Sequence, residues 1–460
     1  MMIETRTEPA SVFRTALDTL WASRKTHAES WDALGVFAVR AGSAALLFLT
    51  QMVLARWMGA SEFGHYVSAW TAVIVVGGVS HLGFNVAMMR LGPQYHANKD
   101  YAAFRGLLRG GRLVSIVSST VIALIGAVAL WLFDAHHTTS LAWPLAIALL
   151  CLPVFALIDV QDCFGRGQGW TMEGIVPPYI VRPIVLLVMV AGASIFGFGA
   201  DATTGMAIAL AATVVAVVLQ TVLIERRVKD AIPVVPPRYD YPTWFRISMP
   251  LLAGGICELV VQNADVLLLN FFQPADEVGH YYAAAKTAGL ALFIHYAVAS
   301  AYAGRIAAAH SIGDTAAVNA LVSSSVRWTF IPTATVVAGI LIVGYPVLAQ
   351  FGDSFTDAYP LMFILAAGIM AKAATGPSDT ILNMLGHQRA SAISMALAAV
   401  LCVVLNIVLV QLWGVTGAAV ATTSAITASS LFNWYAARRL EGLNIFVLAH
   451  LGARAKEASR

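Results

Sequence analysis

Ionisable side chains interrupt several long apolar stretches of this sequence. An ionisable group in the middle of a membrane costs about 2.5–3.5 kcal/mol on insertion scales, so it normally faces a cavity or pairs with a partner. Side chains of this kind are therefore the first candidates for contact with a polar ligand. The candidates are the cations Arg40, Arg182, Lys286 and Lys372 and the carboxylates Glu258 and Asp265.

The cations indicate a cavity with positive walls that binds an anionic ligand. An arginine guanidinium binds a phosphate through two parallel hydrogen bonds, whereas a lysine ammonium acts as a compact point charge. Arg182 lies about 12 Å into its apolar stretch at a rise of 1.5 Å per residue, and Lys372 lies near the middle of another. Arg40 and Lys286 lie closer to the ends of theirs. There, a side chain that reaches back to the membrane surface is the alternative to a ligand role.

The carboxylates allow two interpretations. Glu258 lies near the middle of an apolar stretch, and Asp265 follows it by about two helical turns. In one interpretation, Glu258 forms an ion pair with Lys372 that holds two helices in register. In the other, Glu258 and Asp265 are the sites of ion coupling, because burial favours the protonated acid and lets a carboxylate bind and release a proton.

Other polar residues carry weaker signals. Asp159 and Asp162 lie near the end of an apolar stretch, where we expect them to form a water-exposed cap. The four cysteines include no C-x-x-C pair, so we expect free thiols, with no disulfide framework and no zinc site. No cofactor and no other metal are expected.

The elements that position these residues are long apolar helices. The chain of 460 residues is 59% hydrophobic and 12% charged, whereas an ordinary soluble domain is about a quarter charged. Apolar runs of roughly 20 residues alternate with short polar joints, and this length crosses a membrane as an α-helix. The sequence therefore predicts an all-α polytopic membrane protein. Twelve transmembrane helices are expected, near 34–56, 66–89, 113–133, 141–161, 174–197, 202–224, 247–271, 280–304, 328–349, 358–383, 390–412 and 414–436.

Lysine and arginine predict the orientation, because cytoplasmic joints hold them in excess. The joints after the second and sixth runs are strongly basic, whereas the joints on the opposite side are nearly free of cations. We therefore expect both chain ends in the cytoplasm. The basic residues of these two joints are Arg90, Lys99, Arg105, Arg109 and Arg112, then Arg226, Arg227, Lys229, Arg238 and Arg246.

A short motif occurs twice. Residues 62–66 read Glu-Phe-Gly-His-Tyr and residues 277–281 read Glu-Val-Gly-His-Tyr, a shift of 215 positions. The same shift carries Arg90 onto Arg305. Repeats in one orientation are a standard transporter plan, in which two halves enclose a site and rock about it. The sequence therefore predicts two parallel six-helix bundles around a central cavity.

The expected domain organisation follows from the runs and the repeat. The first segment has apolar residues at helical spacing among charged ones, which is typical of an amphipathic helix on a membrane surface. We expect an amphipathic segment at 1–33, bundles at 34–224 and 247–436, a cytoplasmic linker at 225–246 and a basic cytoplasmic tail at 437–460.

These features resemble a known family. The relevant residues are Ala55 to Gly59, Glu62 to Tyr66, Gly83, Phe84, Arg90, Asp265 and Val278 to Tyr281. They are similar to the polysaccharide-transporter branch, which includes O-antigen flippases, of the multidrug, oligosaccharidyl-lipid and polysaccharide (MOP) exporter superfamily. The similarity extends roughly over residues 34–440.

The resemblance implies a flippase in the inner membrane of a bacterium. Such a protein moves a polyprenyl-pyrophosphate-linked oligosaccharide from the cytoplasmic to the outer leaflet by ion-coupled alternating access, for polysaccharide biosynthesis. Its partners would be the lipid-linked oligosaccharide, membrane lipids and polymerase or export machinery, without nucleic acid. Arg182 and Lys372 would then bind the phosphates of the cargo.

Two alternatives are weighed against the flippase. A multidrug or cation antiporter of the same superfamily needs acidic sites for cationic cargo, whereas the first run carries Arg40 and no acid. A membrane enzyme needs a substantial loop to hold its catalytic groups, and the outer joints are short. We therefore expect a transporter of an anionic cargo and not an enzyme.

Overall fold

The computed structural model describes residues 42–133 and 140–449, and every regular element in those ranges is helical. The expected amphipathic segment 1–33, Arg40 and the last part of the tail lie outside the described residues. A helix over Gly42–Met58 is followed by α2 (Ala60–Ser80), α3 (Phe84–Ala97), α4 (Tyr101–Phe133), α5 (Ala142–Gly167), α6 (Thr171–Val176), η1 (Pro177–Val181), α7 (Arg182–Ile195), α8 (Ala202–Ala231), α9 (Tyr241–Phe272), α10 (Ala275–Gly289), α11 (Leu292–Ser311), α12 (Thr315–Phe351), η2 (Asp353–Ala358), α13 (Tyr359–Ala374), α14 (Ser378–Met384) and α15 (Gln388–Glu441).

The prediction of twelve membrane-crossing helices is confirmed. Ten helical stretches of the described residues are long and apolar enough to cross a membrane, and Gly42–Met58 is a shorter apolar helix. The longest of the ten, α15, has 54 residues and non-helical dihedral angles at Gly414 (φ 57°, ψ −136°), which divide it into the two final spans. With this division the described residues contain twelve spans.

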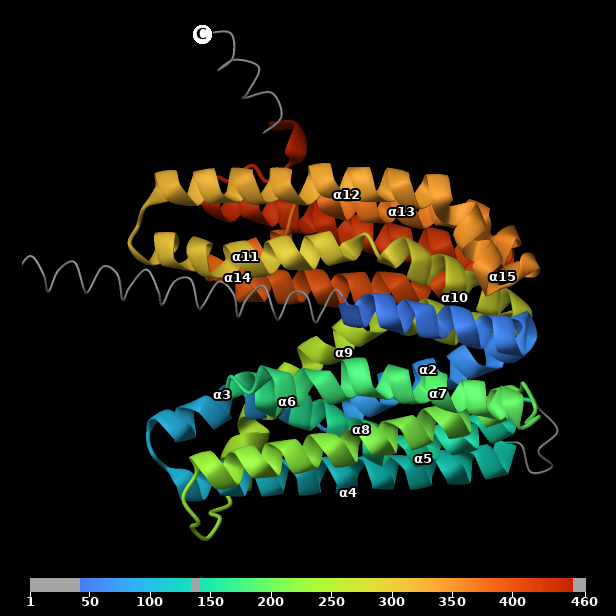
Figure 1. The fold of residues 1–460 in the computed structure, drawn as a ribbon. Coiled ribbons are helices and arrows are strands. Elements are labelled where there is room, and N and C mark those ends of the chain that lie inside the picture. The colour runs from blue at the N-terminus through green and yellow to red at the C-terminus, as the bar shows by residue number, and fades with distance from the viewer. Residues whose placement is uncertain (1–41, 134–139, 450–460) are drawn as a thin grey trace, which may run out of the picture.

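The sequence repeat corresponds to a structural repeat. A shift of 215 positions carries the first residue of α2 onto the first residue of α10, and it carries α4 onto α12 to within three residues at each end. Figure 1 shows two bundles side by side, with α4, α5, α7 and α8 in one and α11 to α15 in the other. We call them the N-terminal half and the C-terminal half.

Helix α9 joins the two halves. Near its start, Trp244 Nε1 donates a hydrogen bond of 3.1 Å to the Tyr95 hydroxyl of the N-terminal half. Further along, Ala264 packs with Cys402 and Ala425 on α15. The helix therefore begins in one half and ends in the other, and Figure 1 shows it between the two bundles.

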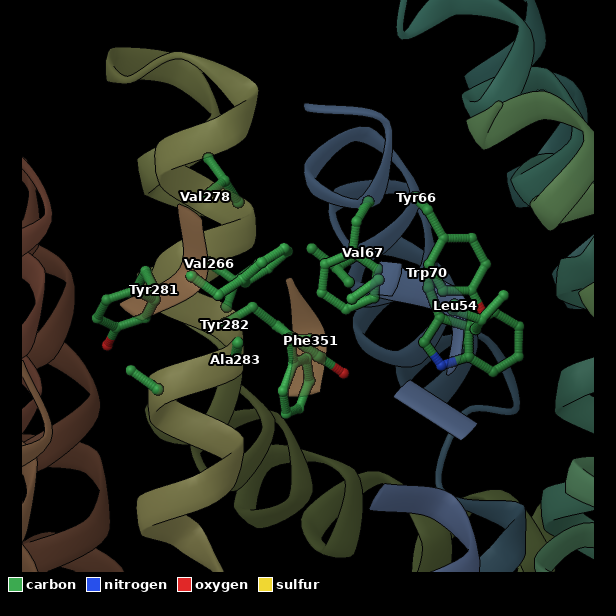
Figure 2. Close-up of a cluster of buried hydrophobic side chains, with 14 of the residues drawn as sticks. Leu54, Tyr66, Val67, Trp70, Val266, Val278, Tyr281, Tyr282, Ala283 and Phe351 are labelled. Atoms are coloured by element: carbon green, nitrogen blue, oxygen red, sulfur yellow. The ribbon is translucent and has the colours of Figure 1, made fainter. Parts of the chain in front are cut away.

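The two copies of the repeated motif meet at a seam between the halves. A Cβ atom on Gly64 of α2 would lie 1.7 Å from the carbonyl oxygen of Ala275, and a Cβ atom on Gly279 of α10 would lie 2.6 Å from that of Ala60. Only glycine permits backbones to approach so closely. Aromatic side chains surround the contact, and Phe63 meets Tyr282 across it at 5.9 Å between ring centroids. Figure 2 shows the aromatic core on both sides of this seam.

Several spans are broken where polar residues lie. The fifth span contains the five-residue π-helix η1, as its prolines predict. Two further breaks were not expected from the sequence. One lies between α2 and α3, where Leu82 and Gly83 have positive φ, and the other lies between α10 and α11. Breaks of this kind are typical of transporters, because unwound backbone inside a membrane survives where protein or water surrounds it.

Candidate functional site

Arg182 is the first residue of α7, directly after the π-helix. Its backbone N–H donates to the carbonyl of Pro177, five residues earlier. The guanidinium carbon lies 5.1 Å from the centroid of the Trp70 ring on α2. A guanidinium at this distance from an indole face is stabilised by a cation–π interaction. Figure 2 shows Trp70 and Tyr66 pointing from α2 toward the helices of the N-terminal half.

The charge of Arg182 has no counter-ion among the described residues. Its electrostatic partners are the Tyr179 and Tyr66 hydroxyls and the Cys151 thiol. None of the ion pairs of the described chain includes it. A half-buried cation held only by aromatic faces and neutral groups is ready to bind an anion.

Lys372 lies in the last two turns of α13, in the C-terminal half. Its ammonium is 5.9 Å from the centroid of the Tyr296 ring. It lines a cavity of about 50 Å³, together with Ser378, Asp379, Ser391, Ser429, Ser430 and Asn433. Polar groups and volume of this kind are suitable for ordered water.

Glu258 does not form the expected ion pair with Lys372. Its side chain is exposed and accepts a hydrogen bond of 3.0 Å from Gln262, one turn further along α9. This interpretation was therefore wrong. The physical reason is that Lys372 faces the cavity of Asp379 instead.

Asp265 and Lys286 lie near the seam. The buried Asp265 carboxylate accepts a hydrogen bond of 2.6 Å from the Tyr281 hydroxyl and one of 3.4 Å from Thr422. It therefore connects α9 to α10 and α15. The Lys286 ammonium lies 4.9 Å from the centroid of the Tyr282 ring, and it interacts electrostatically with Asp265.

The N-terminal half contains a polar cluster that the sequence analysis misjudged. Asp162 is 2% exposed and pairs with Arg166 at 2.9 Å, so the expected water-exposed cap is wrong for this residue. Asp159 Oδ2 lies 3.0 Å from Nε2 of the buried His81 and accepts a hydrogen bond of 3.0 Å from Asn85. Asp162 is buried and Asp159 is 28% exposed, and the neighbours satisfy both carboxylates, which local sequence does not reveal.

The C-terminal half contains a related pair that the sequence analysis missed. His295 Nε2, on α11, lies 3.8 Å from Asp379 Oδ1, on α14. The sequence repeat could have indicated this second pair. The shift that carries His65 onto His280 carries His81 onto Tyr296, next to His295, and Asp159 onto Ala374, just before the turn that leads to Asp379.

The predicted site residues therefore occupy separate places. Lys286 and Asp265 interact near the seam, Lys372 lies in the cavity of the C-terminal half, and Arg182 lies inside the N-terminal half. No contact joins Arg182 to Lys372 in the described part of the chain. A ligand that binds both must span the two halves.

Sequence comparison identifies two matches. Residues 34–303 match a family described as polysaccharide biosynthesis protein. A probable low-salt glycan biosynthesis flippase from Haloferax volcanii, Agl15, is 24% identical over 170 residues, 37% of this chain and 36% of that relative. The chain thus aligns with only about a third of that relative's length.

Solved structures of the MOP superfamily share the fold. An inward-facing multidrug resistance MATE family transporter has a TM-score of 0.71 at 12% identity, over 88% of this chain and 97% of that chain. Lipid II flippase MurJ, in an inward closed conformation, has a TM-score of 0.67 at 12% identity, over 88% of this chain and 87% of that chain. A MOP superfamily transporter from Pyrococcus furiosus has a TM-score of 0.60 at 13% identity, over 88% of this chain and 97% of that chain.

At these identities the structural likeness establishes the fold, and the family match covers more than half of the chain. The chain is therefore a multi-pass membrane protein with the MOP transporter fold, and it belongs to the polysaccharide biosynthesis protein family.

Proposed function

We propose that this protein is a flippase for a polyprenyl-pyrophosphate-linked oligosaccharide, which it moves from the cytoplasmic to the outer leaflet of the inner membrane by alternating access. The observation that carries the proposal is Arg182, a guanidinium inside the membrane without a counter-ion among the described residues. A pyrophosphate supplies that counter-ion, and its paired oxygens match the two parallel donors of a guanidinium.

The second cation lies in the other half. Lys372 faces a polar cavity beside α13 and α14. A diphosphate that contacts both Arg182 and Lys372 would favour the conformation in which the two halves lie close together. A ligand that binds one conformation more tightly than the other shifts the equilibrium between them. Arg40 and Lys286 are the proposed further cations along the path of the anionic headgroup.

The relatives support a lipid-linked cargo. Agl15 is described as a probable flippase of glycan biosynthesis, and MurJ as a flippase of lipid II. The MATE transporters, described by multidrug resistance, share the fold equally well, so a multidrug or cation antiporter is the second candidate. The uncompensated arginine favours the anionic cargo, because a cationic drug would be repelled from it.

Coupling and surroundings complete the proposal. Glu258, exposed on α9, and Asp265, near Lys286, are the proposed carboxylates of ion coupling. Both chain ends are proposed to lie in the cytoplasm. The product, a lipid-linked saccharide in the outer leaflet, would pass to polymerase or export machinery.

The test is a deletion of the gene in the native host. We expect loss of surface or secreted polysaccharide and accumulation of lipid-linked oligosaccharide on the cytoplasmic side. Wild-type protein should restore export, whereas Arg182→Ala and Lys372→Ala should not.

Arg227→Ala is the matched control, because Arg227 is 56% exposed and pairs with Glu173. Normal polysaccharide in the deletion strain, with new sensitivity to cationic drugs, would instead identify a multidrug exporter. Normal export by both variants at normal protein levels would show that these cations do not bind the cargo.

A further inference from the structure

Each half of the molecule contains one histidine–aspartate pair between corresponding spans. In the N-terminal half, His81 follows α2 and Asp159 lies on α5. In the C-terminal half, His295 lies on α11, just after the break that follows α10, and Asp379 lies on α14. The pairs lie on corresponding spans, because the shift of 215 positions brings His81 to within one residue of His295 and Asp159 to within five residues of Asp379. Differences between them therefore indicate what each half does.

In the N-terminal pair the histidine and the carboxylate are within hydrogen-bond distance, and we call it the closed pair. His81 and Asp159 are 3.0 Å apart, and Asn85 donates a second contact of 3.0 Å to the same carboxylate oxygen. Arg166 adds a positive charge nearby. With these neighbours the Asp159 carboxylate is satisfied as an anion.

In the C-terminal pair the histidine and the carboxylate are further apart, and we call it the open pair. His295 and Asp379 are 3.8 Å apart, and the Asp379 side chain is 38% exposed. Asp379 Oδ1 and His295 Nδ1 lack hydrogen-bond partners within the described residues, and so do both ring nitrogens of His81. The two pairs therefore differ at the carboxylate, because Asp159 accepts a hydrogen bond from Asn85. The adjoining cavity of about 50 Å³ has room for a few water molecules.

We propose that this cavity is a proton-binding site, in which His295 and Asp379 share a proton that decides whether Lys372 is available to an anion. Without the proton, the Asp379 carboxylate attracts the Lys372 ammonium across the cavity. When a proton arrives from water, the pair gains one positive charge, and Lys372 is released to bind phosphate. No other bond forms or breaks.

The charges around the pair favour a proton over a metal cation. Lys372 on α13 interacts electrostatically with both members, and Glu258 on α9 and Asp379 both interact with Tyr296 on α11. Helix α15 presents serine and asparagine side chains to the cavity, and α12 presents Ser324 to Tyr302 of α11. A divalent metal ion at Asp379 would be repelled by the Lys372 ammonium about twice as strongly as a proton, because the Coulomb energy is proportional to charge.

The anion-binding part of this inference rests on the proposed function, since it concerns the same Lys372. Linkage requires that if a proton strengthens phosphate binding, phosphate binding takes up a proton. The probe is inorganic pyrophosphate, added to the purified full chain in lipid nanodiscs. Calorimetry in buffers of different ionisation enthalpy measures the protons exchanged.

We expect the wild type to take up about one proton per bound pyrophosphate and to lose about tenfold in affinity for each pH unit over which the pair titrates. Asp379→Asn and His295→Gln should both abolish the uptake, while Asp159→Asn, in the closed pair, should retain it. Because the ionisation of pyrophosphate itself is the same for every variant, the difference between variants reports the site. Equal uptake by Asp379→Asn and the wild type would overturn the proposal.

A second measurement separates this proposal from the proposed function. If pyrophosphate does not bind at all, the anion site is wrong, and infrared difference spectra between pH 5 and pH 8 test the proton site alone. Loss of a carboxyl signal in Asp379→Asn but not in Asp159→Asn would support the proton site. Identical spectra for the wild type and Asp379→Asn would exclude it.

Discussion

The two halves share one plan but balance their charges differently. Three arginine–carboxylate pairs join elements of the N-terminal half or tie the following linker to it, and a fourth lies within α5. Within the described part of the C-terminal half, the ion pairs involve histidine only. The arginine pairs are Arg112–Glu225, Arg166–Asp162, Arg227–Glu173 and Arg238–Asp100. The histidine pairs are His81–Asp159 in the N-terminal half and His295–Asp379 and His387–Glu441 in the C-terminal half.

This difference indicates that the charges of the two halves respond differently to pH. An arginine is charged at every physiological pH, whereas a histidine changes its charge near pH 6.5 or so. Four of the five ion pairs described in or beside the N-terminal half therefore keep their charge at every physiological pH, and Arg182 has no carboxylate partner among the described residues. The ion pairs of the described C-terminal half contain histidine and no arginine.

The largest expected effect concerns the two cations. Hydrogen bonds to charged groups contribute about 1.5–3 kcal/mol, so Arg182→Ala should weaken pyrophosphate binding by roughly 10- to 100-fold. Lys372→Ala should have a smaller effect above neutral pH, because Asp379 already attracts that ammonium. Calorimetry on both variants measures the difference in pyrophosphate affinity. Arg182→Lys is the control, because it keeps the positive charge but loses the two parallel hydrogen-bond donors of the guanidinium. Equal losses would contradict the asymmetry of the halves.

The seam provides the next comparison. Overpacking typically costs about 1–3 kcal/mol, and a methyl group on Gly64 would overlap the Ala275 carbonyl more deeply than one on Gly279 would overlap that of Ala60. Gly64→Ala should therefore lower the thermal unfolding temperature more than Gly279→Ala. Gly254→Ala is the control, since a Cβ atom there meets nothing within 4 Å. If all three variants unfold alike, the halves do not meet at these glycines.

Substitutions in the histidine–aspartate pairs should have an intermediate effect on the free energy of unfolding. Asp159→Asn removes the charge that His81 and Asn85 contact, and the loss should be about 1.5 kcal/mol in the free energy of unfolding. Asp379→Asn should be nearly neutral at pH 8, because its partner is further away. Denaturant titrations in detergent measure both values. A larger loss for Asp379→Asn would reverse the assignment of closed and open pairs.

The smallest effect is expected at the rim of the seam. His65 and His280 of the repeated motif contact Ser140 and Ser354 at 2.9 and 3.3 Å, in exposed positions. Exposed contacts of this kind usually change stability by less than about 0.5 kcal/mol when removed. His65→Ala and His280→Ala should both remain within that range in the same titrations. A cost above it for one histidine alone would show a further asymmetry.

Much of the fold could be predicted from the sequence because its causes are local. Apolar length determines a membrane span, and the repeated Glu-Phe-Gly-His-Tyr motif determines the relation of the halves. The prolines before Arg182 are also a local cause, because a proline interrupts an α-helix wherever the helix packs. These signals do not depend on where the helices pack.

The polar pairs could not be predicted because their causes are non-local. His81 and Asp159 are 78 residues apart in the chain, and His295 and Asp379 are 84 apart. Whether a carboxylate in an apolar run meets water, an arginine or a histidine depends on the angle at which its helix packs. For the same reason, the sequence allowed an ion pair between Glu258 and Lys372, whereas in the structure Lys372 faces the cavity beside Asp379.

The π-helix before Arg182 determines the rotational phase of α7. A hydrogen bond over five residues holds about one residue more than an α-helical turn, and one residue corresponds to about 100° of rotation. The buried stripe of α7, formed by Pro183, Leu186, Val190 and Ala193, is thus out of phase with the helix that precedes it. Loss of a single residue between Pro177 and Val181 would bring the two segments into phase and turn the guanidinium away from Trp70. The orientation of this charge therefore depends on the length of one turn as much as on the identity of its residue.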